Sequence, residues 1–283
     1  MSAAELRPAW SEQFTPEAIR ELVSYGPLAD ISPEWAWGGS TGKGVRVAVV
    51  DTGIEHDHPA LGDAVKGGVV IKLDDEEKSG YRADPDEPPH DMAGHGTACA
   101  GIIHEIAPQA ELYSVRVLGD NMRGRAYVFA GGLDYAIEHD MNVVNMSLST
   151  KSENFFAIFH DLADQAFFKG IPLVSAVNNI HEASYPSTYS SVISVAANES
   201  TDPFTYQYNP NPPVEFGAPG INVRVAWSGK QYATNTGNSF AAPHITGLVA
   251  LIRAKHPQLT PFQIKTVLLA CAANMRREEQ PDE

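Results

Sequence analysis

The stretch VRVAVVD, residues 45–51, decides the fold, because it is apolar at nearly every position and ends in an acid. A strand with a continuous rather than an alternating apolar pattern belongs in a parallel sheet that is buried on both faces. Similar short runs follow along the chain, and each predicts a strand. They are VVIKL (69–73), LYSVRVL (112–118), VVNMSL (143–148), IPLVSAV (171–177) and VISVAA (192–197).

Helical segments alternate with these runs. Residues 95–106, 125–140 and 153–169 are predicted helices between the strands. Near the C-terminus, Ser239 to His256 carries the apolar run LVALI and predicts a helix through the core. A last helix, Pro261 to Met275, begins after Thr260. This alternation predicts an α/β fold with three layers, α/β/α, around a mainly parallel central sheet.

The composition is that of a globular chain with ample material for a core. Of 283 residues, 43% are hydrophobic, and the length suits one large domain or two small ones. We expect one domain over residues 41–275, an N-terminal extension (1–40) that packs on it, and a flexible acidic tail (276–283). No window approaches 18 apolar residues and the N-terminus has no apolar leader, so we expect a cytoplasmic chain without membrane partners.

Charge and cysteine usage narrow the partners. The net charge of −15 argues against nucleic acid and anionic membranes, and it favours encounters with basic peptides or proteins. Two cysteines, Cys99 and Cys271, imply no disulfide framework and are predicted to be free thiols. Nothing in the sequence predicts the oligomeric state.

One segment, LDDEEKSGYRADPDEPPHD (73–91), holds eight acids against one lysine and one arginine. Its favoured interpretation is a solvated loop. A cation site, or an electrostatic lip for a basic substrate, is the alternative. The spacing of the acids does not match an EF-hand loop.

The stretch TGNSFAAPHITG (236–247) places Ser239 in a pattern close to the G-x-S-x-G of α/β-hydrolases. Those enzymes need an acid and a histidine after the serine, whereas no acid occurs here between Ser239 and Glu278. The reverse order is available, with Asp51 at the end of a buried strand, His95 in GHGTACAG, and then Ser239. An acid can hold the imidazole in one tautomer, and a helix that opens at Ser239 would favour developing negative charge.

Three segments, VAVVDTGIEHDHPAL, HGTACAG and GNSFAAPHITG, resemble the signature segments of the subtilisin-like serine peptidases (subtilases), in the order of that family. The resemblance extends from about Gly44 to Ala273. It implies a subtilisin-like fold and a serine endopeptidase that works through an acyl-enzyme, with Asp51, His95 and Ser239 as its triad. The implied substrates are peptides or proteins, and the implied setting is intracellular precursor processing or protein turnover. A pseudo-protease that only binds peptides, and an esterase with the same triad, are the alternatives.

The resemblance also assigns an oxyanion hole. Asn179, in VSAVNN, matches the family's oxyanion asparagine. Asn238 stands where subtilases usually have threonine, and its side-chain amide is expected to substitute as a donor. Phe240 replaces the methionine that commonly follows the nucleophile, which removes an oxidisable sulfur.

The resemblance implies the substrate-binding residues as well. Ser147, Leu148 and Ser149 match the strand that lines the S1 pocket, and Arg123 and Gly124 lie in the segment that pairs with substrate as an added strand. Ser149, and Ser184 in SYPS, replace glycines that usually keep S1 open. We therefore expect a smaller or more polar S1 pocket and small or polar P1 residues.

The same resemblance bears on cofactors. The chain runs directly through His104-Glu105-Ile106, without the insertion that wraps a tight calcium ion in secreted subtilisins, and Ala60 stands where an acid ligand would fall. We expect no required cofactor, no tight calcium site and no catalytic metal, with weak calcium binding left open at the acidic segment. Cys99, one helical turn after His95, is interpreted as a small packing residue.

Overall fold

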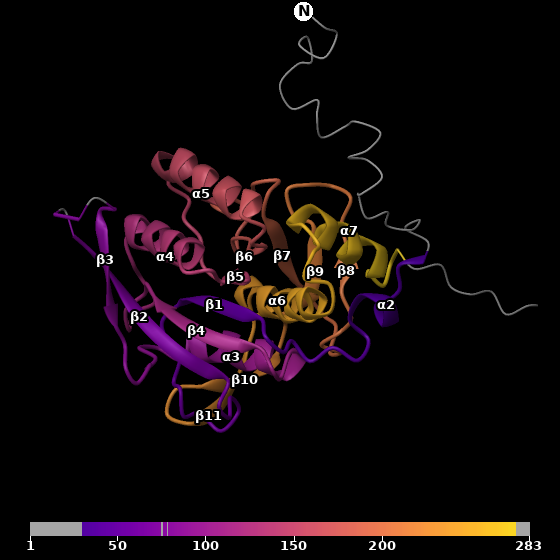
Figure 1. Cartoon of the computed structure of the whole chain (residues 1–283), viewed down its shortest axis with the longest axis horizontal. Coiled ribbons are helices and arrows are strands. Elements are labelled where there is room, and N and C mark those ends of the chain that lie inside the picture. Colours follow the sequence, from indigo (N-terminus) through magenta and orange to yellow (C-terminus); the bar gives the residue numbers. More distant parts are fainter. Residues whose placement is uncertain (1–29, 75, 78, 276–283) are drawn as a thin grey trace, which may run out of the picture.

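The computed structural model describes residues 30–74, 76–77 and 79–275. A nine-stranded sheet runs through its centre in the order β3-β2-β4-β1-β5-β6-β7-β9-β8 (Figure 1). Neighbours from β2 to β9 pair in parallel, and the two edge strands, β3 and β8, pair antiparallel. The sheet strands are β1 (Arg46–Asp51), β2 (Val65–Leu73), β3 (Tyr81–Pro85), β4 (Glu111–Arg116), β5 (Val143–Met146), β6 (Leu173–Ala176), β7 (Ile193–Asn198), β8 (Gln207–Tyr208) and β9 (Phe216–Pro219). A hairpin of β10 (Val223–Trp227) and β11 (Gln231–Asn235) stands apart from the sheet.

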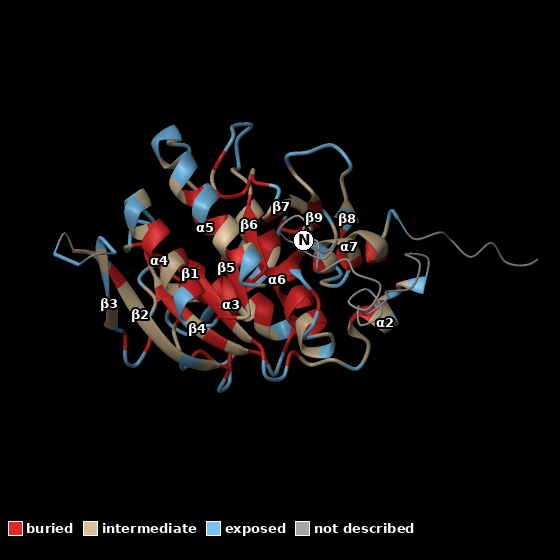
Figure 2. Ribbon diagram, turned by 45° about the horizontal axis from the view of Figure 1, so that its top comes forward, coloured by how far each residue is buried: buried red, intermediate tan, exposed pale blue. Residues whose placement is uncertain are grey.

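Helices cover both faces of this sheet, and one buried cluster of apolar side chains lies on each side. On one side are α3 (His95–Ile106), α6 (Asn238–Lys255), α7 (Pro261–Cys271) and the short α2 (Pro33–Trp37); on the other are α4 (Ala126–Glu138), α5 (Phe156–Phe168) and the 3₁₀ turn η4 (Glu153–Phe155). Figure 2 shows the buried residues concentrated in the central strands and the inner helices. The predicted three-layer α/β/α fold with a mainly parallel sheet is confirmed.

The central elements are buried for the reason that the sequence suggested. In β1, five of the six residues, Val47 to Asp51, are buried, because α3 covers one face and α4 the other. α6 packs so closely on α3 that a Cβ on Gly247 would lie 2.7 Å from the Ile106 side chain. Among the described helices, none is long and apolar enough to cross a membrane.

The acidic segment is not simply a solvated loop, so that interpretation was wrong in part. Residues Tyr81–Pro85 form the edge strand β3, which pairs antiparallel with β2. Asp84 pairs with Lys72 of the neighbouring strand β2 at 2.7 Å and with Arg82 of its own strand at 3.0 Å, and an opposite-charge pair across strands such as Lys72–Asp84 helps an acidic sequence to join a sheet. Among the described acids of this segment, none belongs to a group of three ligand atoms that could hold a metal ion.

The first described residues pack on the domain. Helix α2 begins after Ser32, whose side chain accepts a hydrogen bond from the Trp35 N–H. The ring of Trp35 stacks on His256 with 4.2 Å between centroids, and Lys255 donates to the carbonyls of Glu34 and Gly38. The rest of the predicted N-terminal extension (1–29) and the predicted tail (276–283) lie outside the described residues.

Candidate active site

Two elements, β1 and α3, bring Asp51 and His95 together. Asp51 is the last residue of β1 and His95 the first residue of α3, and both side chains are buried. The Nδ1 of His95 lies 2.8 Å from Asp51 Oδ1 and 2.9 Å from Oδ2. The Thr52 N–H donates to Oδ1 as well, at 2.8 Å. The carboxylate is therefore fixed, and it holds the imidazole with Nδ1 as the donor, which leaves Nε2 as the free base.

Ser239 lies in the first turn of α6, where backbone N–H groups have no intrahelical acceptor. It shares the lining of a cavity of about 300 Å³ with His95 and Asn179. Phe240 packs against the His95 ring, with 5.3 Å between ring centroids. Serine, imidazole and amide thus face one cavity at a helix N-terminus, where the helix dipole stabilises negative charge.

The electrostatics of the pair follow from its burial. Burial is the largest single effect on His95 and disfavours the charged imidazolium, but the negative charge and hydrogen bonds of Asp51, together with the contact from Cys99, outweigh it and hold the pKa of His95 well above 6.5. The same burial raises the pKa of the Cys99 thiol. Cys99 is therefore a neutral thiol beside the site rather than a second nucleophile.

Cys99 also contacts a carbonyl of α6 that lacks its helical hydrogen bond. Pro243 has no N–H, so it cannot donate to the carbonyl of Ser239 four residues earlier. The Cys99 Sγ lies 3.6 Å from that carbonyl oxygen and 3.8 Å from Asp51 Oδ2, and its one proton can serve either acceptor. Its interpretation as a buried packing residue agrees with its full burial.

Asn179 lies just beyond β6 with one end of its side chain fixed. Its Oδ1 accepts a hydrogen bond from the Asn238 N–H at 3.0 Å. Because the carbonyl end of the amide is engaged, the nitrogen end is the one available to a ligand. Asn179 and Ser239 line the same cavity.

The side chain of Asn238 does not have the predicted free donor. Its Nδ2 donates to the carbonyls of Val177, at 3.3 Å, and Asn178, at 2.9 Å, and its Oδ1 accepts from the Ala197 N–H at 2.8 Å. Two carbonyls on one side and an N–H on the other also fix the orientation of the amide. The prediction of a side-chain oxyanion donor is therefore wrong: this amide joins the ends of β6 and β7.

The predicted substrate-binding residues divide into two groups. Ser147, Leu148 and Ser149 follow β5 and line the cavity beside Ser239. Arg123 and Gly124 are exposed and do not line it, so their contact with substrate stays a prediction. Sequence reasoning missed the apolar part of the lining, because nothing in the local pattern separates those side chains from the core. These missed residues are Leu118, Met122, Phe129, Ala176 and Val177.

Ser184, which was predicted to line the S1 pocket, does not line the cavity that holds Ser239. It is buried, and its hydroxyl lies 2.9 Å from that of Ser187. It lines a neighbouring cavity of about 530 Å³, which meets the first one at residues 177–179. Its hydroxyl is engaged with Ser187, and of the two serines only Ser149 lines the cavity beside Ser239.

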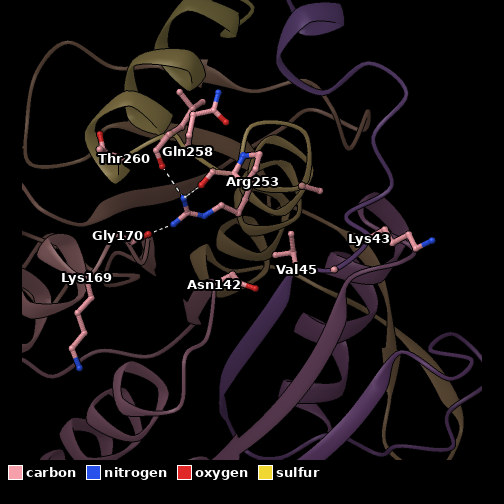
Figure 3. A pocket seen from close by; sticks show the side chains of 12 residues that line it. Lys43, Val45, Asn142, Lys169, Gly170, Arg253, Gln258 and Thr260 are labelled. Carbon is pink, nitrogen blue, oxygen red and sulfur yellow. Dashed lines mark hydrogen bonds between the residues drawn. The ribbon is translucent and has the colours of Figure 1, made fainter. Parts of the chain in front are cut away.

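A further cavity, of about 480 Å³, lies where α6 joins α7 (Figure 3). Arg253 donates to the carbonyls of Gly170, Pro257 and Leu259, and it thereby ties the loop after α6 to the turn after α5. The labelled lysines at its rim point away from it in Figure 3. Of the described residues, no acid, histidine or cysteine lines this cavity, and its lysines point away from it, so no acid–base pair faces it.

The described residues contain one group of three potential metal ligands, Asp51, His95 and Cys99. The atoms that could bind a metal already contact one another: His95 Nδ1 lies against Asp51, and Cys99 Sγ lies near both. The segment in which secreted subtilisins were said to carry a calcium-binding insertion is short here, because α3 ends at Ile106 and β4 starts at Glu111.

The sequence matches the family model described as "Subtilase family" over residues 42–282. The chain therefore belongs to the subtilase family. It is 34% identical over 249 residues to Subtilisin BL of Lederbergia lenta, which covers 84% of this chain and 86% of that protein. A crystal structure of a cold adapted subtilisin-like serine proteinase superposes with a TM-score of 0.68 at 26% identity, covering 82% of this chain and 83% of the other.

Other relatives are longer than this chain. The chain is 34% identical over 252 residues to the Minor extracellular protease Epr of Bacillus subtilis, covering 84% of this chain and 36% of Epr. It is 36% identical over 239 residues to the Thermostable alkaline protease of Halalkalibacterium halodurans, covering 80% of this chain and 62% of that protein. The aligned part thus spans only about a third of one relative and less than two thirds of the other.

Proposed function

We propose that this protein is a serine endopeptidase that cleaves peptide bonds through an acyl-enzyme. The observation that carries the proposal is the pair of contacts from Asp51 to His95 Nδ1, at 2.8 and 2.9 Å, in a site whose cavity also holds Ser239. His95 takes the proton of the Ser239 hydroxyl at Nε2, and the Oγ attacks the scissile carbonyl. His95 then gives the proton to the leaving amine, and water resolves the ester by the same route.

Negative charge develops on the carbonyl oxygen of the substrate during attack. In this proposal Asn179 donates from its amide nitrogen and Ser239 from its backbone N–H. Asp51 remains charged and stabilises the imidazolium. The support is geometric, because the Asn238 N–H holds the carbonyl end of the Asn179 amide and so leaves the nitrogen end as the donor.

The experiment is covalent labelling with a fluorophosphonate probe, together with hydrolysis of a protein substrate. The wild-type chain should be labelled and should hydrolyse the protein, and Ser239→Ala should lose both while keeping its unfolding curve. Labelling that persists in Ser239→Ala would refute the assignment of the nucleophile. An unlabelled wild-type protein that still binds peptides would support the pseudo-protease alternative, and turnover of esters alone would support the esterase.

We propose small or polar P1 residues as the preferred substrates. Ser149 supports this, because it lines the cavity at a position where related enzymes have glycine. Ser149→Gly should raise kcat/KM for P1 Phe or Tyr about tenfold, by roughly the range that one extra group in an apolar pocket discriminates. A cleavage profile of the wild-type enzyme dominated by P1 Phe or Tyr would overturn the proposal.

We propose that catalysis needs no cofactor and no tightly bound calcium. The support is the direct link from α3 to β4 and the absence of an acid at Ala60. Activity and unfolding temperature should be the same with and without EDTA. A fall in unfolding temperature of many degrees with EDTA would show a strong calcium site.

We propose an intracellular role in precursor processing or protein turnover. Its support is limited to two buried cysteines that form no disulfide, Cys99 and Cys271, as suits a reducing compartment. Immunodetection in cell fractions tests this, and a signal confined to the medium would reject it.

A further inference from the structure

One carboxylate of the acidic segment is hydrogen-bonded around the Asp51–His95 pair. The Oδ1 of Asp91 accepts from the Thr52 hydroxyl at 2.7 Å, from the Ala93 N–H at 2.9 Å and from the Gly94 N–H at 2.8 Å. Its Oδ2 accepts from the Thr97 N–H at 2.8 Å and the Thr97 hydroxyl at 2.6 Å. Asp91 therefore receives five hydrogen bonds, from the residue that follows Asp51 and from residues on both sides of His95.

The hydroxyls of the two threonines link the segment that follows Asp51 to the segment that carries His95. Thr52 directly follows Asp51, and its hydroxyl accepts from the Gly96 N–H at 2.9 Å, next to His95. The Thr97 hydroxyl accepts from the Glu55 N–H, also at 2.9 Å. A hydroxyl has one proton, and both threonines donate theirs to Asp91. Because each hydroxyl proton points to Asp91, the lone pairs of the two hydroxyls are free to accept from the Gly96 N–H and the Glu55 N–H.

Asp91 also caps α3, the helix that begins at His95. The residue before that helix is Gly94, which has no side chain to cap it and has φ +97°. The N–H of Thr97, in the first turn, finds its acceptor in Asp91 instead. A negative charge at this end of a helix is favourable, and the contact fixes the turn from which the imidazole projects.

We propose that Asp91 is a positioning residue for the catalytic pair. It holds the first turn of α3 against the end of β1, so that His95 Nδ1 stays 2.8 Å from Asp51 Oδ1. This inference rests on the proposed peptidase function for its kinetic consequence. A displacement of about 1 Å in a catalytic group costs about 10²-fold in rate, so the loss of Asp91 should appear in kcat rather than in KM.

Asp86 provides a matched control from the same segment. It is more deeply buried than Asp91, and it pairs with Arg116 at 3.3 Å and His90 at 2.7 Å. None of its described contacts reaches Thr52, Thr97 or the catalytic pair. Asp86→Asn and Asp91→Asn each remove a buried or half-buried charge and put an amide N–H against donors, but only the donors to Asp91 belong to the segments that carry the catalytic pair.

The test measures kcat, KM, the rate of fluorophosphonate labelling and the far-downfield proton signal of His95 Nδ1–H. Asp91→Asn should lower kcat and the labelling rate about 10- to 100-fold, leave KM within about twofold, and shift or broaden the downfield signal. Asp86→Asn should lower stability and leave these four readouts near wild type. Equal effects of the two substitutions, or an unchanged signal in Asp91→Asn, would overturn the inference.

A milder pair keeps the test decisive if Asp91→Asn does not fold. Thr97→Val removes one of the crossing hydroxyls, and Thr97→Ser retains it. Valine should lower kcat several-fold and serine should restore it, and equal kcat in the two would contradict the inference. Failure of the proposed function is recognised separately, as a wild-type protein that the probe does not label; the His95 signal then still reports on positioning.

Discussion

The Oδ1 of Asn179 accepts a hydrogen bond from the Asn238 N–H at 3.0 Å. This contact gives the two asparagines different tasks. It orients the Asn179 amide so that its nitrogen can serve the cavity, while the Asn238 side chain is bonded elsewhere. Two predictions follow for these two residues.

Asn179→Ala should lower kcat about 10²- to 10³-fold with little change in KM, because it removes a donor that strengthens only as the oxyanion forms. Steady-state kinetics on a peptide substrate measures this. Asn178→Ala is the control, since Asn178 lines the same cavity while its side chain accepts from the Ile180 N–H. A similar loss in both variants would contradict the assignment.

Asn238→Ala should act mainly on stability. The substitution leaves two carbonyls and one N–H without their partner. Each of these groups that stays buried and unsatisfied costs about 1–3 kcal/mol of the free energy of unfolding. Denaturant unfolding measures the fall in the free energy of unfolding. If Asn238→Ala instead kept its stability and lost 10²-fold or more in kcat, Asn238 would be an oxyanion donor after all.

The acid limb of activity should lie above the ordinary titration range of histidine. Burial lowers the pKa of His95, but the charge and hydrogen bonds of Asp51, with the contact from Cys99, together raise it to well above 6.5, and the base is active only when neutral. In Asp51→Asn the limb of kcat/KM should move to lower pH, and kcat should fall about 10⁴-fold. An acid limb that stays in place would contradict the role of Asp51.

The raised pKa of His95 also makes stability depend on pH, in the direction opposite to that of activity. Because the folded state holds the His95 proton more tightly, this contribution to the free energy of unfolding is complete below the unfolded pKa. It is lost as the pH rises through the folded pKa. Activity should therefore appear over the pH range in which this contribution is lost, and pH-dependent unfolding of wild type and Asp51→Asn compares the two.

His244 should make the protein less stable in acid. Burial lowers its pKa to about 4, against a weaker opposing effect of its bond to the Phe240 carbonyl. The unfolded state then binds the proton first, so stability falls as the pH drops from the unfolded value toward the folded one. Wild type should lose about 2 kcal/mol more than His244→Gln between pH 7 and pH 5. Equal slopes in denaturant unfolding would reject this.

Phe240 should make the enzyme tolerant of oxidants. Its ring packs against His95 with 5.3 Å between centroids, and a phenyl ring at this place has no sulfur to oxidise. After peroxide treatment, the residual activity of Phe240→Met should be lower than that of wild type by about fivefold or more, because the methionine sulfoxide that forms beside His95 is bulky and polar. Loss of wild-type activity to the same extent would show that another residue is the sensitive one.

The sequence by itself determined the fold class and the order of the functional residues. A continuous apolar run such as Val45 to Val50 needs cover on both faces, and this requirement is local enough to be read from composition. The predicted helix 95–106 has the bounds of α3, and the predicted helix at 239–256 differs from α6 by one residue at each end. The three signature segments likewise identified Asp51, His95 and Ser239, since their pattern is contiguous in the chain.

Only the tertiary structure decided what the polar side chains do. Asn238 and Asp91 have short polar side chains that can bond to many partners, so their tasks depend on which backbone groups the fold places within about 3 Å. Those partners come from other elements: β6 and β7 for Asn238, β1 and α3 for Asp91. The edge strand β3 was missed for the same reason, because its place in the sheet depends on pairing with β2 rather than on its own acidic sequence.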